Sequence, residues 1–365
     1  MKRRMFSRWF GTVLVLVGSQ VVAAAVSGQE LLTALRSPIL LRGDAHTAFR
    51  DPLLIHERGE FRLFYSWVRE EEDQLIYWYT AVSTSSDLRN WSAPRALTPK
   101  DQNLNYASPG NVVRVGDEYL LCVQTYPIVG FRRGDPLRYA DARARLWLLR
   151  SRDLETWSRP ELINVKGPGI GEAALGKMID PFLLRDKDTP GKWWCFFKQN
   201  QRVHCSWSLD LAAWTPGPID LAHGENPCVI VQGDEYVLFY APNDNGIGVK
   251  RSRDLVTWRE EAPPMTLGQS EWPWAGNRIT AGYVEDLRHL PGVGRYVLVF
   301  HGGGPGRERS DANENANCHI GIAWSSDLRT WAWPGRDWTA AAARCTIDHP
   351  ALDPWPYPQL KTPLP

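Results

Sequence analysis

Three acidic residues stand in similar places along this sequence, each shortly before a proline that opens an apolar run. They are Asp51 (in FRDPL), Asp180 (in MIDPF) and Glu225 (in GENPC). Carboxyl groups that share a partly desolvated pocket repel one another, which raises the pKa of at least one of them and keeps a proton available near neutral pH. Cleavage of a glycosidic bond needs this combination, because a protonated acid serves the leaving oxygen while a carboxylate activates water or attacks carbon.

A five-fold repeat explains how residues so far apart could meet. The phrase Asp-Leu-x-x-Trp occurs five times, and its Asp stands at positions 87, 153, 210, 254 and 327. A repeat of this size indicates a supersecondary unit that buries its apolar face against its neighbours. Within each unit, apolar runs and Gly-containing turns alternate, as in residues 52–55, 58–60 and 61–65, which indicates short antiparallel strands. We therefore expect an all-β fold, a five-bladed β-propeller with four-stranded antiparallel blades, in which residues 38–41 add a strand to the last blade.

The repeat also separates structural acids from candidate catalytic ones. The Asp of each phrase lies in the turn between the third and fourth strands, where it can accept hydrogen bonds from backbone N–H groups while the Trp packs against the blade. Asp51, Asp180 and Glu225 instead occur in three of the five units, at the start of the innermost strand. The other two units have Ser108-Pro109 and Thr280-Ala281 there. Innermost strands line the axial channel, so we expect the three carboxylates to converge at its top; the alternative is that the Asp-Pro pairs only begin edge-like strands.

Residues 45–340 resemble the family 43 glycoside hydrolases and their relatives, five-bladed propeller glycosidases that include arabinanases, arabinofuranosidases and xylosidases. The resemblance rests on Asp51-Pro52, Asp180-Pro181 and Glu225-Asn226-Pro227, together with the blade repeat. Carried over by position, it implies that Asp51 is the general base, that Asp180 tunes pKa and orientation, and that Glu225 is the general acid. It also implies hydrolysis of a plant or algal oligosaccharide or polysaccharide with inversion of configuration.

Some features of the chain leave other activities open. The Arg50-Asp51-Pro52 context is also similar to the sucrose- and fructan-cleaving propellers, although those carry Arg-Asp-Pro in a middle blade. Arabinanase-like members have a His near a central calcium ion at the start of the fifth inner strand, where this chain has Gly276-Asn277-Arg278. We therefore expect no cofactor and no metal site, with a central calcium ion as the alternative. An anhydrogalactosidase-like enzyme, and a non-catalytic propeller whose acids only bind glycan hydroxyls, are further alternatives.

Other residues are expected to bind the substrate, because loops at the top of the propeller should set specificity. Aromatic faces suit sugar rings, and Arg suits hydroxyls or a carboxylate. The candidates for substrate binding are Arg50, Ser108, Trp272, Trp274, Arg278 and His46. In a chain with 18 Trp, core packing is the alternative for the two tryptophans, and a surface position is the alternative for His46.

The uninterrupted repeats favour one domain, and the N-terminal segment favours export. The chain has 365 residues, of which 43% are hydrophobic and 23% charged, and its net charge of +1 gives no reason to expect nucleic acid or an anionic membrane as a partner. A basic start, an apolar run and Ala23-Ala24-Ala25 predict a secretory signal peptide at residues 1–28, and hence a periplasmic or extracellular location; a membrane anchor is the alternative. The propeller would occupy residues 29–340, with a Pro-rich tail at 341–365 packed on its outside.

Export would permit disulfide bonds among the six cysteines. Cys195 and Cys205 flank a turn expected at residues 199–201 and could face each other across a hairpin. The alternative is that all six cysteines are buried as small hydrophobic side chains.

Overall fold

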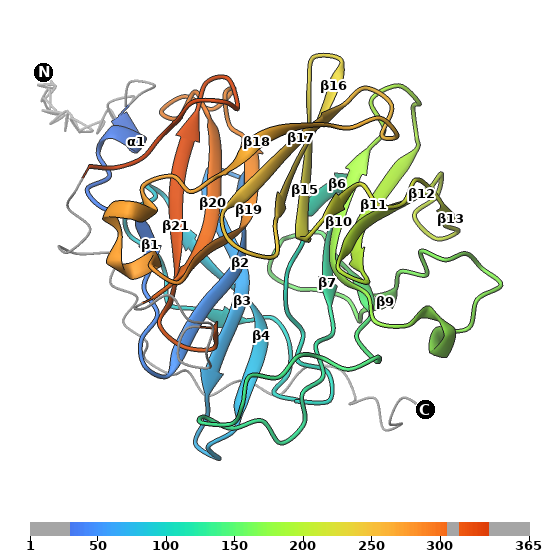
Figure 1. Cartoon of the computed structure of the whole chain (residues 1–365), viewed down its shortest axis with the longest axis horizontal. Coiled ribbons are helices and arrows are strands. Elements are labelled where there is room, and N and C mark those ends of the chain that lie inside the picture. The colour runs from blue at the N-terminus through green and yellow to red at the C-terminus, as the bar shows by residue number, and fades with distance from the viewer. Residues whose placement is uncertain (1–29, 305–313, 336–365) are drawn as a thin grey trace, which may run out of the picture.

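The structure, a computed structural model, describes residues 30–304 and 314–335 (Figure 1). The predicted signal peptide (1–28), the predicted tail (341–365) and Cys345 lie outside the described residues. The helical elements with described bounds are short; they are α1 (Glu30–Thr33) and the 3₁₀ turns η1 (Glu172–Leu175), η2 (Gln269–Glu271) and η3 (Pro273–Ala275). In the ranges that are described, none of these helices has the length and apolar character needed to cross a membrane.

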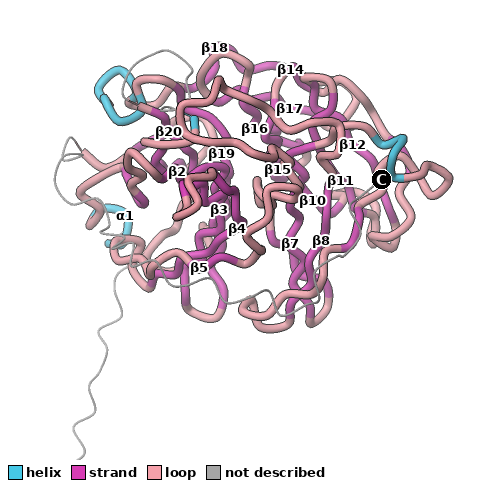
Figure 2. Tube along the Cα trace, turned by 90° about the horizontal axis from the view of Figure 1, so that it is seen from below, coloured by secondary structure: helices cyan, strands magenta, loops and turns pink. Residues whose placement is uncertain are grey.

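The fold is a five-bladed β-propeller, as predicted from the repeat. Each blade is an antiparallel meander, and the blades follow one another around the molecule in chain order (Figures 1 and 2). The first blade comprises β2 (Thr47–Glu57), β3 (Glu60–Glu70), β4 (Ile76–Ser85) and β5 (Arg95–Ala96). The second comprises β6 (Val112–Val115), β7 (Glu118–Gln124), β8 (Leu146–Ser151) and β9 (Glu161–Leu162).

The remaining three blades repeat this pattern with small additions. The third comprises β10 (Ile179–Arg185), β11 (Trp193–Gln199), β12 (Arg202–Ser208) and β13 (Thr215–Pro216), and β14 (Ala222–His223) also pairs with β12. The fourth comprises β15 (Glu225–Gln232), β16 (Glu235–Ala241), β17 (Ile247–Ser252) and β18 (Arg259–Met265). The fifth comprises β19 (Arg278–Asp286), β20 (Tyr296–Gly303), β21 (Cys318–Ser325) and β22 (Trp331–Ala332).

The two ends of the propeller meet at the last blade. Strand β1 (Ile39–Leu41) pairs antiparallel with β21, with Ile39 opposite Gly321, so the N-terminal side of the chain adds a strand to the fifth blade as expected. Strand β2 joins β21 through one parallel residue pair, Ala48 with Cys318, which links the first and last blades into one continuous sheet. The innermost strands β2 and β19 also contact each other, which closes the ring around the axis.

The five Asp-Leu-x-x-Trp phrases form the turns that the sequence predicted. In the second blade the Asp153 carboxylate accepts the backbone N–H groups of Glu155 (2.8 Å) and Thr156 (2.7 Å), and these hydrogen bonds lower the pKa of Asp153 to about 2. The Trp157 ring packs edge-on against Phe64 of the first blade, with ring centroids 6.1 Å apart. The phrase therefore caps its own turn and joins neighbouring blades, which is a structural role.

Cys195 and Cys205 do not face each other across the hairpin, because the strand register keeps them apart. The β11–β12 hairpin has a two-residue turn, Asn200-Gln201, and both residues adopt the left-handed conformation (φ 51° and 62°). This turn sets Cys195 opposite Ser206 and leaves Cys205 opposite Phe196. Because successive side chains of a strand point to opposite faces, the two thiols lie on different sides of the sheet. The described cysteines are buried and free; they are Cys122, Cys195, Cys205, Cys228 and Cys318.

Candidate active site

A break in the ladder of each innermost strand positions the candidate residues. In β2 the register with β3 shifts between Arg50 and Leu53, and β10, β15 and β19 shift at the matching place. A left-handed backbone in a residue other than glycine costs about 1–2 kcal/mol, and such bulges often re-aim side chains beside active sites. At this position of each blade, one residue adopts the left-handed conformation; the five are Asp51 (φ 48°), Ser108 (38°), Asp180 (57°), Asn226 (49°) and Ala281 (52°).

The bulge positions show that the three acids are not equivalent in the repeat, as the sequence comparison had assumed. Asp51 and Asp180 occupy the bulge position itself, but in the fourth blade this position belongs to Asn226. Glu225 is one residue earlier and is therefore equivalent to Arg50 in the first blade. The sequence comparison had treated Glu225 as equivalent to the two aspartates, because all three precede a proline. The one-residue offset gives Glu225 a different direction and different neighbours from the two aspartates.

In three of the blades, a residue on the second strand holds the bulge of the next blade. Ser66 on β3 accepts the N–H of Ser108 (2.7 Å) and also donates its hydroxyl proton to Asp51 Oδ2 (2.8 Å). Gln124 on β7 accepts the N–H of Asp180 (2.5 Å). His301 on β20 accepts the N–H of Asp51 through Nδ1 (3.0 Å). These contacts cross from blade to blade, so the positions of the carboxyl groups depend on the closed ring.

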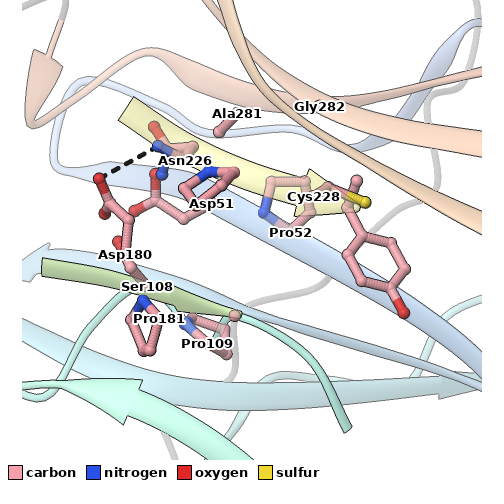
Figure 3. Close-up of a pocket in the computed structure, with 13 residues that line it drawn as sticks. Asp51, Pro52, Ser108, Pro109, Asp180, Pro181, Asn226, Cys228, Ala281 and Gly282 are labelled. Atoms are coloured by element: carbon pink, nitrogen blue, oxygen red, sulfur yellow. Dashed lines mark hydrogen bonds between the residues drawn. The ribbon is translucent and has the colours of Figure 1, made fainter. Parts of the chain in front are cut away.

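Asp180 is the carboxyl group that holds a proton near neutral pH. Its side chain is buried, and its Oδ2 accepts the backbone N–H of Asn226 at 3.2 Å (Figure 3). Burial is the main cause that raises the pKa of Asp180 to about 7, and the negative charge of Glu225 raises it further. The sequence predicted a raised pKa for at least one of the three acids, and in the structure Asp180 has such a pKa.

Glu225 is held in its ionised form. Lys198, the last residue but one of β11, places its Nζ 2.5 Å from Glu225 Oε2, and Arg278 donates from a terminal nitrogen to Oε1 at 3.0 Å. Burial raises the pKa of Glu225, but the charges of Lys198 and Arg278 outweigh it and hold this pKa at about 2. Asp180 is therefore protonated near neutral pH while Glu225 is ionised. A pair of carboxyl groups whose pKa values are pushed apart is typical of a site with acid and base roles.

The three acids line one small cavity together. Asp51, Asp180 and Glu225 share its wall with Trp78 and Tyr126, among other residues. This cavity continues into a larger one of about 380 Å³, because Trp78, Tyr126 and Glu225 line both. On the axial side it adjoins a narrow hollow to which all five blades contribute, and Figure 3 shows its prolines beside the two aspartates. The candidate site is therefore an open pocket whose floor is formed by carboxyl groups.

Three of the residues predicted to bind substrate lie at this site. Arg50 lines both cavities and donates to the backbone carbonyl of Glu314 at 3.1 Å. Ser108 lines the small cavity. Arg278 is buried and donates to Glu225 and to the Pro242 carbonyl (3.0 Å), so it orients the acid and is not placed to contact a sugar.

The other three predicted binding residues line neither cavity. Trp272 and Trp274 are buried; their rings stack with centroids 5.2 Å apart and also stack on Phe300 of the fifth blade. Their apolar surface is used in the core, which was the alternative at the sequence level. His46 is exposed, bonds Glu70 at 2.8 Å and does not line the cavities.

Sequence reasoning missed the residues of the second strands. In every blade, one residue of the second strand pairs with the inner-strand residue that precedes the bulge. Four of these five residues are polar; the five are Ser66, Gln124, Lys198, Ala241 and His301. Counting outward along both strands of each predicted hairpin from its turn would have paired these second-strand residues with the starts of the inner strands. The sequence signal was a polar residue at the end of a second strand that is otherwise apolar.

Among the described residues, no group of three or more His, Cys, Asp or Glu side chains is arranged to hold a metal ion. The start of the fifth inner strand carries Arg278, whose guanidinium is turned toward Glu225. A cationic side chain at that place does not suit a cation site, and no step below uses a metal.

Comparisons with known proteins agree with this fold. No protein-family model matches the chain, and no curated protein sequence matches it either. A solved thermostable family-43 glycoside hydrolase superposes with a TM-score of 0.54 at 14% identity, covering 80% of this chain and 95% of that one. The xylan β-1,4-xylosidase of Bacillus halodurans C-125 gives 0.54 at 15% identity over 80% of this chain, which spans only 54% of that enzyme. A further structure described as a glycoside hydrolase gives 0.58 at 14% identity, covering 83% of this chain and 96% of that one. Identities this low establish the propeller fold alone.

Proposed function

We propose that this chain is a glycoside hydrolase that cleaves a glycosidic bond of a plant or algal oligosaccharide or polysaccharide with inversion of configuration. The observation that carries the proposal is the meeting of Asp51, Asp180 and Glu225, from three different blades, on one cavity wall. The names of the structures with the same fold, a family-43 glycoside hydrolase and a xylan β-1,4-xylosidase, support the same class of reaction.

The proposed roles follow the order of the blades. Asp51 is the general base that takes a proton from the attacking water, and the hydroxyl of Ser66 fixes its carboxylate. Glu225 is the general acid that protonates the leaving oxygen. Asp180 is the carboxyl group that sets the protonation of Glu225, because each influences the other electrostatically. Arg50 and Ser108 contact the sugar that occupies the cavity.

Glu225 needs a proton before it can act as an acid, and in the free protein it carries none. Asp180 holds one below pH 7 or so, because its pKa is raised to about 7. We propose that the bound substrate draws Lys198 away from Glu225, which removes the nearer of the two positive charges that keep this carboxylate ionised. The proton of Asp180 then passes to Glu225 and on to the leaving oxygen, while Asp51 takes a proton from the attacking water. After the products leave, Asp51 releases its proton to solvent and Asp180 takes one up, which resets the site.

A second candidate function is glycan binding without catalysis. The pairing of Glu225 with Lys198 and Arg278 favours it, because a permanently ionised Glu225 can accept hydrogen bonds from hydroxyls but cannot protonate a leaving group. Hydrolysis and binding alone differ in whether the bound glycan is cleaved, whereas both require that the glycan binds in the cavity.

The test is hydrolysis of a panel of aryl glycosides and of plant and algal oligosaccharides by the wild type and by Glu225→Gln. Loss of a general acid should lower kcat by about 10²–10⁴-fold. Glu285→Gln is a matched control, since Glu285 is half-buried like Glu225 but bonds Tyr283 and lines neither cavity. Activity that survives in Glu225→Gln would remove the assignment of the acid. The anomer formed first, followed by NMR, tests inversion.

Location and cofactor use are part of the proposal. Residues 1–28 would direct the chain to the periplasm or the medium, which cell fractionation checks. The proposed reaction needs no metal or other cofactor, so turnover should be the same before and after treatment with a chelator.

A further inference from the structure

Among the described residues that line the large cavity, positive side chains outnumber negative ones. The acidic residues of this part of the wall are Glu225 and Glu314. Its cationic residues are Arg50, Arg138, Lys177 and Lys198. A cavity wall with excess charge of one sign concentrates ligands of the other sign, because a low-dielectric surrounding focuses the field.

Two of these cations are neutralised by the two acids. Lys198 pairs with Glu225 at 2.5 Å, and Arg50 pairs with Glu314 at 3.5 Å. These two pairs use both acidic residues of the wall. The excess positive charge of the cavity therefore belongs to Arg138 and Lys177.

Lys177 differs from Arg138 in its surroundings. Arg138 reaches Asp135 at 3.5 Å, and both side chains are exposed to solvent. Lys177 forms no ion pair with any residue in the ranges 30–304 and 314–335. Its Nζ instead lies 5.7 Å from the ring centroid of Tyr126 and 5.9 Å from that of Tyr139, in two cation–π contacts.

Lys177 has room for a closer anionic partner than the protein itself gives it. The side chain is half-buried, and burial, followed by the nearby charge of Lys198, lowers the pKa of Lys177, while the more distant charges of Asp180, Glu225 and Asp141 only partly offset this effect. Lys177 is also only three residues before Asp180, at the start of an inner strand, so the backbone holds it close to the proposed catalytic carboxyls. A ligand anion at this point would form a charge-assisted hydrogen bond, which is about twice as strong as a neutral one.

We propose that the cavity takes an acidic sugar, and that Lys177 binds the carboxylate of a uronic acid residue there. This inference rests on the proposed function, because it names the substrate class of the same site. The tyrosine rings beside Lys177 offer the flat apolar faces on which a sugar ring packs. A sulfate ester carries the same charge as a carboxylate and is the other source of this chemistry.

Isothermal titration calorimetry on the whole chain tests the inference through binding alone. The probes are galacturonic acid against galactose, glucuronic acid against glucose, and galactose 6-sulfate. The uronic acids should bind about tenfold more tightly than their neutral partners, the usual worth of a hydrogen bond to a charged group. Lys177→Gln should remove this advantage. Lys250→Gln should keep it, since Lys250 also lies 5.7 Å from a tyrosine ring centroid but outside the cavity.

The outcomes separate this inference from the proposed function. Equal affinity for acidic and neutral sugars, or a preference that survives Lys177→Gln, would overturn the inference and leave hydrolysis untouched. Preferred binding of the sulfate would confirm an anion site and assign it to sulfate esters instead of uronic acids. Tight binding of uronic acids without hydrolysis of any glycoside would support this inference and end the proposed hydrolase.

Discussion

Replacing Asp180 by Asn should stabilise the folded protein at neutral and alkaline pH. The buried carboxyl group must lose its proton there, in a place where burial and the charge of Glu225 both oppose ionisation. An amide of the same shape cannot ionise, and its oxygen can still accept the N–H of Asn226 that now bonds Oδ2 at 3.2 Å. The substitution therefore removes the electrostatic cost and keeps the hydrogen bond.

The magnitude follows from the difference between the two pKa values. Folding raises the pKa of Asp180 from 3.8 to about 7. A raised pKa contributes stability that is fully present below pH 3.8 and is lost as pH rises through about 7. At about 1.4 kcal/mol for each pH unit, the full loss approaches about 4 kcal/mol. Because Glu225 titrates together with Asp180, we expect Asp180→Asn to gain about 2–4 kcal/mol at pH 8 and distinctly less at pH 5.

Urea unfolding at pH 5, 6.5 and 8 measures this gain. Asp153→Asn is the control of opposite sign, because backbone N–H groups lower the pKa of Asp153 to about 2 and its ionised form stabilises the fold. That variant should be less stable than the wild type at pH 8. An Asp180→Asn protein that is no more stable than the wild type at pH 8, or whose gain does not grow between pH 5 and pH 8, would refute the reasoning.

Two further predictions concern the neighbours of the site. Lys198→Met removes the shorter ion pair of Glu225 (2.5 Å), so the pKa of Glu225 should rise by about one unit or more. An NMR pH titration of this carboxyl carbon, assigned with Glu225→Gln, checks it, and an unchanged titration would contradict the role given to Lys198. Trp272→Ala should cost about 3–5 kcal/mol in the free energy of unfolding, because the buried ring stacks on Trp274 and Phe300. A small loss of stability combined with a large rise in KM would restore Trp272 to the substrate site.

The sequence by itself determined the propeller and the location of the three acids. The Asp-Leu-x-x-Trp phrase marks every blade, because each blade is a local meander whose turns and alternating strands are written in neighbouring residues. The same local logic predicted that residues 38–41 would join the last blade and that residues 51, 180 and 225 would meet at the start of inner strands. None of these inferences needed a contact between blades to be known in detail.

Only the tertiary structure decided the chemistry of the site. Protonation depends on burial and on distances between side chains of different blades, so the sequence could not assign the proton to Asp180 or the ion pair with Lys198 to Glu225. A one-residue offset at a bulge separated Glu225 from the two aspartates, and a two-residue turn separated Cys195 from Cys205. Trp272 and Trp274 lie in the core, where both rings stack on Phe300. In each case a small change of register or direction moves a side chain to another face, and local sequence patterns carry too little information to specify it.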